Sequence, residues 1–194
     1  MKQTTREKIL DAVFELVYIY GYNGTSMSMI LKECNIPKGS LYHYFKSKKE
    51  MVLAVIKERL HPRMDEFYDL NNNENKHPVD ILIEVIYKVA QKEQLLLYGC
   101  PLNRLNQEMS PIDKDFEAAI TPIYNHIKVK IVYLLSDADI KSGTNTKELA
   151  EFIIASVWGA LSLSPTQSSK ARYLATVSHL VRYLQSLKKL DHSV

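Results

Sequence analysis

The chain has 194 residues, of which 46% are apolar and 24% are charged, and its formal net charge is +3. This balance excludes wholesale disorder and allows a sizeable core, in one domain or in a small domain joined to a larger one. Only six glycines occur, and no alternating apolar runs bounded by turn signals stand out. We therefore expect an all-α protein.

Three classes of protein are disfavoured at this level. No stretch of 18 uncharged apolar residues occurs, so no membrane span or membrane partner is expected. Residues 1–7 lack the apolar core of a signal peptide. The two cysteines, Cys34 and Cys100, are too far apart to indicate a disulfide framework. A reduced, cytoplasmic protein is the simplest expectation.

About nine helices are predicted, and the first three are close together. The first runs from Thr5 to Tyr20 and is stopped by Gly21. Ser26 is a candidate N-cap for the second, because its hydroxyl can accept from a backbone N–H two or three residues later. Residues 34–36 make a tight turn, and Pro37 stands where the third helix can begin, since its missing N–H is not needed there.

Four more helices follow along the chain. The fourth starts after Ser47 and meets Pro62, where an interior proline should kink or interrupt it. A fifth is expected from Val79 to about Leu97. A short sixth covers Leu102–Met109, and a seventh, capped near Asp113, extends to Leu135.

Two apolar helices complete the pattern. Thr146 is expected to cap the eighth, which is apolar almost all the way round between Phe152 and Leu163. Ser168 or Ser169 opens the ninth, which ends near Lys189. A helix without a polar face must be buried on both sides, so this pair is a candidate association surface.

The second and third helices form a candidate helix-turn-helix. Leu41 and Phe45 lie four residues apart, so one face of the third helix is apolar and can anchor it. The opposite face presents Tyr42, His43 and Tyr44, as a reader of the major groove requires. The residue pattern alone also fits an ordinary helical hairpin.

The same segments resemble the DNA-binding domain of the TetR family of transcriptional regulators, the TetR/AcrR-type repressors. The resemblance rests on Thr25–Ile30 and on Lys38–Met51, and it covers residues 5–60. It implies a helix-turn-helix domain over residues 1–46 and a ligand-binding and dimerisation domain over residues 47–194. It also implies a homodimeric repressor that a small-molecule inducer releases from a palindromic operator of double-stranded DNA.

The basic residues gather where DNA would bind. Residues 1–60 hold ten Lys and Arg against six Asp and Glu, whereas residues 61–194 hold fifteen against sixteen. A phosphate-binding surface carries such an excess, although a solvated basic face does so too. By the resemblance, Lys48 starts the fourth helix over the DNA backbone. The candidate DNA-binding residues are Ser26, Ser28, Lys38, Gly39, Ser40, Tyr42, His43, Tyr44 and Lys48.

The larger domain supplies two further candidate sets. An inducer pocket should draw on aromatic side chains, which offer an apolar ring and often a polar handle, although each one can equally be core or surface. This pool is Phe67, Tyr68, Tyr87, Cys100, Phe116, Tyr124, Tyr133 and Trp158. The last two helices either pair with a second chain, as the resemblance implies, or form an intramolecular hairpin. The candidate interface is Phe152, Val157, Leu161, Leu174, Val177, Val181 and Leu184.

Other functions find less support in the residues. Cys100 could be a reactive thiolate that senses oxidants or electrophiles, as in some relatives, or simply a small buried side chain. The six histidines are scattered, and no hydrolase, metalloprotease, nucleotide-binding or metal-ligand motif occurs. We therefore expect no enzyme, no metal and no cofactor. A helical interaction adaptor that does not bind DNA is the alternative from another class.

Overall fold

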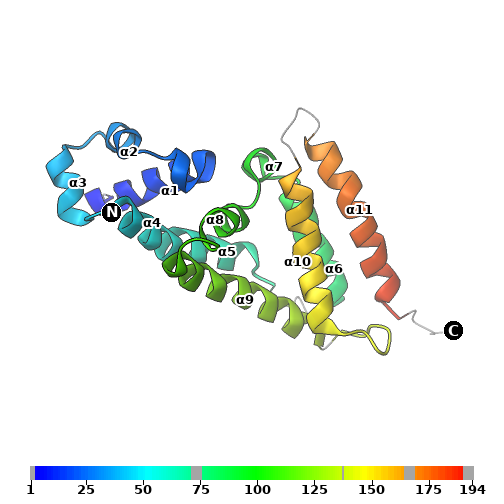
Figure 1. Cartoon of the computed structure of the whole chain (residues 1–194). Helices are drawn as coiled ribbons and strands as arrows, with labels where there is room; N and C mark the ends of the chain where they lie inside the picture. Colours follow the sequence, from blue (N-terminus) through cyan, green and yellow to red (C-terminus); the bar gives the residue numbers. More distant parts are fainter. Residues whose placement is uncertain (1–2, 71–75, 137, 164–168, 190–194) are drawn as a thin grey trace. The chain divides into compact units, whose positions relative to one another are not determined.

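The structure is a computed structural model that describes residues 3–70, 76–136, 138–163 and 169–189 (Figure 1). Within these ranges the chain forms helices α1 to α11 and one π-helical segment, η1, and no strand, so the predicted all-α fold is confirmed. The chain divides into two compact units. The first contains Met1–Glu66 and Pro101–Ile123, and the second contains Phe67–Cys100 and Tyr124–Val194. The division expected at residue 46 is a functional one and stays a prediction.

The first unit contains the candidate helix-turn-helix and two helices from later in the chain. Its elements are α1 (Thr5–Gly24), α2 (Met27–Cys34), α3 (Lys38–Tyr44), α4 (Lys48–Val55), η1 (Ile56–Leu60), α5 (His61–Phe67), α8 (Pro101–Met109) and the first part of α9 (Lys114–Ser136). A capping box starts α1, because Thr4 accepts from the Glu7 N–H while Glu7 accepts from the Thr4 N–H. The Asp113 carboxylate accepts from the Asp115 N–H at the start of α9.

Two interruptions shape this unit. Gly21 was expected to end the first helix, but it lies inside α1 with φ 78° and ψ 172°, and the helix resumes as far as Gly24. The predicted interruption near Pro62 is confirmed. In the wide turn η1, the His61 N–H bonds to the carbonyl of Ile56, and α5 starts at His61. Such π turns absorb an extra residue without ending the helix.

The second unit packs long helices around an aliphatic core. Its elements are α6 (Pro78–Val89), α7 (Glu93–Tyr98), the rest of α9, α10 (Thr146–Ser162) and α11 (Ser169–Leu187). Helix α11 contacts both α10 and α6. The fully buried residues include Tyr173, Ile127, Ile131 and Leu184. No helix in the described ranges is long and apolar enough to cross a lipid bilayer.

Two details of the predicted boundaries are wrong. The single helix expected over Val79–Leu97 is two helices, because the chain makes a tight turn after Val89 in which the Lys92 N–H bonds to the Val89 carbonyl. The N-cap of α10 is Asn145 rather than Thr146, and its side chain accepts from the Lys147 and Glu148 N–H groups. Ser169 begins α11, and Ser168 lies outside the described residues.

Candidate nucleic-acid interface and apolar cavity

The third helix has the two faces that a groove reader needs. Leu41 and Phe45 are buried, and they anchor α3 to the first unit. Tyr42, His43 and Tyr44 are exposed, with Tyr42 at 42%. The His43 and Tyr44 rings meet edge to face, with their centroids 5.2 Å apart. Polar aromatic groups therefore face outward from a short, well-anchored helix.

Helix α2 is fixed at both ends by local contacts. The Ser26 hydroxyl accepts from the Met29 N–H at 3.2 Å, so the predicted N-cap is confirmed. Ser26 and Ser28 are both exposed, and their hydroxyl oxygens lie 2.8 Å apart. At the other end Asn35 adopts the left-handed conformation with φ 48°, which turns the chain toward α3. Both serines are thus available to a phosphate on this surface.

The start of α3 is open to a close partner. Lys38 is exposed, and its ammonium lies 5.9 Å from the centre of the Tyr42 ring. A Cβ atom placed on Gly39 would meet no atom within 4 Å, so the surface above this backbone is free. Ser40 is half-buried beside them. A phosphate could therefore approach the backbone here, with Lys38 nearby to neutralise it.

Lys48 has a structural role that its position in the sequence did not indicate. Its Nζ atom donates to the carbonyls of Tyr22, at 2.8 Å, and Thr25, at 2.9 Å, and lies 4.2 Å from the centre of the Tyr22 ring. Burial lowers the pKa of Lys48, and the nearby Glu108 carboxylate opposes this shift. An ammonium has three N–H donors, so one remains for a phosphate.

Sequence reasoning missed one part of this site altogether. The Glu108 carboxylate, on α8, accepts hydrogen bonds from the backbone of Tyr22 and Asn23. The partners are 85 or more residues apart, and no local pattern marks Glu108. Only Gly21, as a helix-stopping residue, gave a signal that this part of α1 is irregular.

Comparison with known proteins identifies the family of this chain. A model of bacterial regulatory proteins of the tetR family matches residues 9–55. The chain is 35% identical over 167 residues to the HTH-type transcriptional regulator in the lacX 3′ region of Lactococcus lactis, covering 83% of both chains. The chain belongs to the TetR family. It is a DNA-binding transcriptional regulator of the helix-turn-helix type and not an enzyme.

Solved structures share this TetR-family fold over nearly the whole chain. A TetR regulator from Chloroflexus aurantiacus superposes with a TM-score of 0.82 at 24% identity, covering 94% of this chain and 95% of the other. The reduced form of Escherichia coli NemR gives a TM-score of 0.77 at 20% identity, covering 96% and 98%. At these identities the likeness concerns the fold alone.

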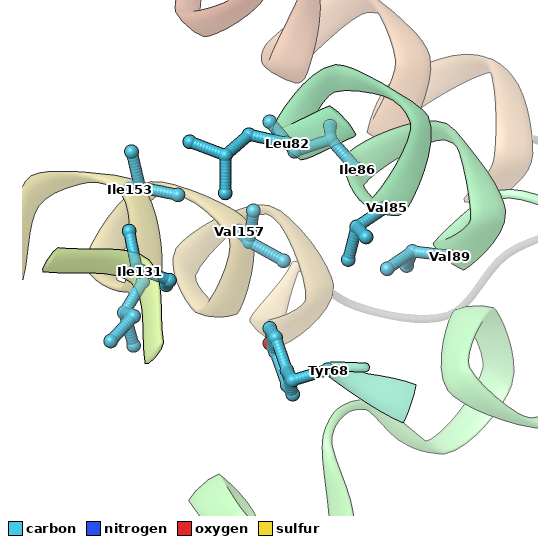
Figure 2. A pocket seen from close by; sticks show the side chains of 9 residues that line it. Tyr68, Leu82, Val85, Ile86, Val89, Ile131, Ile153 and Val157 are labelled. Carbon is cyan, nitrogen blue, oxygen red and sulfur yellow. The ribbon is translucent and has the colours of Figure 1, made fainter. Parts of the chain in front are cut away.

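In the second unit, α6, α9 and α10 enclose a small apolar cavity of about 20 Å³, shown in Figure 2. A volume of this size is enough for about one water molecule. Aliphatic side chains form most of the wall, and Tyr68 closes one side. The lining residues are Tyr68, Leu82, Val85, Ile86, Val89, Ile131, Ile153, Ile154 and Val157.

Polar groups next to the cavity are few. Burial raises the pKa of the Tyr68 phenol, and the nearby Trp158 indole weakly opposes this shift. Trp158 is only 9% exposed, and its N–H lies near the Tyr68 phenol but makes no hydrogen bond of good geometry with any described residue. A buried N–H without a partner costs folding free energy, and a ligand that places a hydrogen-bond acceptor there would recover part of that cost. The cavity thus combines an apolar wall with one unsatisfied donor nearby.

The other aromatic residues of the predicted pocket are dispersed. Tyr68 lines the cavity, and Trp158 lies beside Tyr68. The Trp158 ring packs against that of Tyr124, with the ring centroids 5.5 Å apart. Tyr124 bonds to the Glu151 carboxylate, and burial together with this acid raises its pKa to about 12. The other members do not line the cavity: Phe116 belongs to the first unit, Tyr87 and the 74%-exposed Tyr133 face solvent, and Phe67 stacks under Lys88.

The candidate interface residues fall into two groups in the single chain. Val157 lines the cavity, and the others that are buried pack within the second unit: Leu161, Val177, Val181 and Leu184. Leu174 is half-buried, and Phe152 is 49% exposed. The Phe152 ring meets that of Tyr183, which is 44% exposed, at a centroid distance of 5.8 Å. Their role in an interface stays a prediction.

Cys100 is the last residue before α8 and belongs to the second unit. It is only 6% exposed, and it lies close enough to Tyr68 to affect the pKa of that phenol. Burial in apolar surroundings disfavours a thiolate, which is the reactive form of cysteine. The position fits a small packed side chain.

Proposed function

We propose that this protein is a homodimeric repressor that binds a palindromic operator and is released from it by a small, mainly apolar molecule. The observation that carries the proposal is the exposed face of α3, with Tyr42, His43 and Tyr44 outward on a buried anchor. In this proposal residues 1–46 read the DNA, and residues 47–194 bind the inducer and dimerise. The protein acts in the cytoplasm, where its operator lies.

Dimerisation is supported by the outer face of α10 and α11. We define this outer face by its exposed residues Phe152, Ala155, Gly159, Leu163, Ala175, His179 and Tyr183. It combines a pair of half-exposed aromatic rings with small residues that let another helix approach closely, and a Cβ on Gly159 would meet no atom within 4 Å. Exposed apolar surface of this kind marks interaction sites. A palindrome needs two readers about 34–36 Å apart, which one chain cannot supply.

The cavity supports the proposal of an inducer and indicates its chemistry. No charged side chain lines it, so a charged ligand would lose hydration without a compensating partner. The free N–H of Trp158 can donate to one acceptor, such as a carbonyl or ether oxygen. At about 20 Å³ the space must widen to admit such a molecule. Binding would therefore repack α6, α9 and α10, which is a route by which a ligand can shift a conformational equilibrium.

A cysteine-based sensor is the alternative within the same family. It would need an accessible thiolate, whereas Cys100 is buried. Among the described residues of the second unit, the apolar cavity supports a bound ligand, whereas the burial of Cys100 disfavours a thiol sensor, so we propose control by a bound ligand.

Selection of DNA by the full chain tests the proposal. Wild-type protein is used to select duplexes from a random-sequence pool, and the recovered sequences are read for symmetry. We expect two inverted half-sites and an affinity that falls steeply with salt, since phosphate contacts release counterions. Recovery of unrelated sequences, or binding that salt does not weaken, would instead favour the helical adaptor. A single unpaired half-site would contradict the dimeric arrangement.

A further inference from the structure

The break in α1 leaves backbone groups without their helical partners. Gly21 has φ 78°, a conformation that side-chain-bearing residues rarely adopt. In an unbroken helix the N–H groups of Tyr22 and Asn23 would bond to carbonyls four residues earlier, one of which belongs to Ile19. The break therefore leaves two N–H groups, and the carbonyls of Tyr18 and Ile19, to find partners other than each other.

Helix α8 supplies partners for both sides of the break. The two Glu108 carboxylate oxygens accept from the N–H groups of Tyr22 and Asn23, each at 2.8 Å. Arg104 donates to the Ile19 carbonyl at 3.5 Å. Arg104 and Glu108 lie four residues apart, on one face of α8. One helix thus carries an acceptor for the N–H groups and a donor for the carbonyl.

Helix α4 also stabilises this turn, by bonding to its carbonyl groups. Lys48 donates to the carbonyls of Tyr22 and Thr25. The buried Thr25 side chain donates in turn to the Gly21 carbonyl, at 2.7 Å. Helix α2 begins at Met27, two residues after Thr25. The direction in which α2 and α3 leave α1 therefore depends on this turn. Glu108 and Lys48 both hold it by hydrogen bonds to its backbone.

We propose that Glu108 is a positioning residue for DNA recognition. With Gly21, Tyr22, Asn23 and Lys48 it forms a latch, which we call the α1 latch, that fixes the reading helices relative to α8. Helix α8 starts at Pro101, directly after Cys100, where the chain passes from the second unit into the first.

Glu108 also lies close to Gly21 itself. A Cβ atom on Gly21 would lie 2.8 Å from Glu108 Oε2, so a side chain there would push the end of Glu108 away from the Tyr22 and Asn23 N–H groups. Hydrogen bonds to a charged acceptor are about twice as strong as those between neutral groups. We therefore expect these hydrogen bonds to depend both on glycine at position 21 and on the Glu108 carboxylate.

The test is Glu108→Gln in the full chain, with Glu117→Gln as the matched control. Both variants remove one negative charge from the first unit, and Glu117 is an exposed residue of α9 outside the latch. By electrostatics alone, either change should tighten DNA binding slightly. The latch predicts the opposite for Glu108→Gln: binding to a duplex selected by the wild type weakens roughly tenfold, as expected when charged hydrogen bonds are lost.

Two further readouts separate positioning from general damage. The amide protons of Tyr22 and Asn23 should exchange faster in Glu108→Gln than in Glu117→Gln, while the slope of affinity against salt stays that of the wild type, since Glu108 neutralises no phosphate. The exchange measurement needs no DNA, so it distinguishes failure of the latch from failure of DNA binding.

Two results would overturn the proposal. One is a folded Glu108→Gln protein that binds the duplex as tightly as the control does, and the other is unchanged exchange at Tyr22 and Asn23. Glu108→Asp keeps the charge but withdraws the carboxylate by one methylene, and it should also weaken binding. This second variant decides the matter if the glutamine variant does not fold.

Discussion

The helix-turn-helix and the apolar cavity are held by different kinds of contact. Around the turn between α1 and α2, charged side chains bond to backbone groups at 2.8 to 2.9 Å, as Lys48 and Glu108 do. Around the cavity the contacts are aliphatic, and they leave both a small space and the unsatisfied N–H of Trp158. Directional bonds fix an orientation, whereas aliphatic contacts tolerate repacking. This difference supports the proposal of a reader that is held rigidly and a ligand site that can adjust its packing.

The largest effect should come from a charge placed in the aliphatic interior of the second unit. Leu184 is fully buried, so Leu184→Asp should lower the free energy of unfolding by about 4 kcal/mol or more. Gln185→Asp, on the neighbouring exposed residue, is the control and should change little. Urea unfolding followed by circular dichroism measures both. Equal midpoints would show that water reaches Leu184 and that this interior is not a dry core.

A charge on the outer face should instead separate the chains and leave each one folded. Gly159→Arg is expected to give a monomer by sedimentation and to reduce operator affinity about a hundredfold or more, since the two half-sites are no longer bound by one particle. The exposed Gln91→Arg serves as a control with the same added charge. A Gly159→Arg protein that remains dimeric at micromolar concentration would place the interface elsewhere.

Lys48→Ala tests two roles of this lysine in DNA binding. One is its hydrogen bonds to the turn between α1 and α2, which we call bracing, and the other is neutralisation of a phosphate. We expect roughly tenfold weaker binding to all sequences and a salt slope that is flatter by about one unit. Lys46→Ala, on an exposed lysine, is the control for general charge. Wild-type affinity at several salt concentrations would remove Lys48 from the interface. Weaker binding with an unchanged slope would leave it only the bracing role.

The smallest effect concerns pH. The Lys49 ammonium, which bonds to Asp113 and Asp115, holds the pKa of Asp113 below its usual range, and these acids raise the pKa of Lys49 to about 12. The stabilisation is therefore present above the unfolded Asp pKa of about 3.9 and is lost as the pH falls further. It is also lost as the pH rises from the unfolded Lys pKa of about 10.4 towards 12.

Melting curves of the wild type and Lys49→Met should show this dependence. The two melting temperatures should differ between those limits and converge below the folded pKa of Asp113. A difference that persists in strong acid would show that Lys49 stabilises by packing and not by charge.

Local features of the fold could be predicted from the sequence because their causes are local. The cap at Ser26, the start of the fourth helix after Ser47, and the interruption at Pro62 each depend on residues within one or two turns. The turn between α6 and α7 could not be predicted, because no proline or glycine marks it. Helical periodicity also identified the buried faces of α10 and α11. It could not tell whether the same chain or a second chain covers them, as Val177 and Leu184 illustrate.

The candidate site shows the same limit. The four-residue spacing of Leu41 and Phe45 predicted that they form the buried face of α3 and leave the opposite face exposed. Both residues are buried in the structure. The partnership of Glu108 with Tyr22 joins residues 86 positions apart, and a single sequence contains no sign of it. Aromatic composition suggested a pocket of tyrosines, yet aliphatic side chains form most of the cavity wall. Composition gives the chemistry that is available, and only the packing shows which side chains meet.

The unpaired indole beside the cavity gives the protein an optical reporter of its own. Trp158 is the only tryptophan in the 194 residues, so all indole fluorescence comes from this one place. Buried indoles emit at shorter wavelengths than solvated ones, and emission responds to a new acceptor or quencher at the N–H. A compound that occupies the cavity should therefore change the emission spectrum of the unlabelled protein. Libraries of uncharged molecules could be titrated directly, without DNA and before any operator is known.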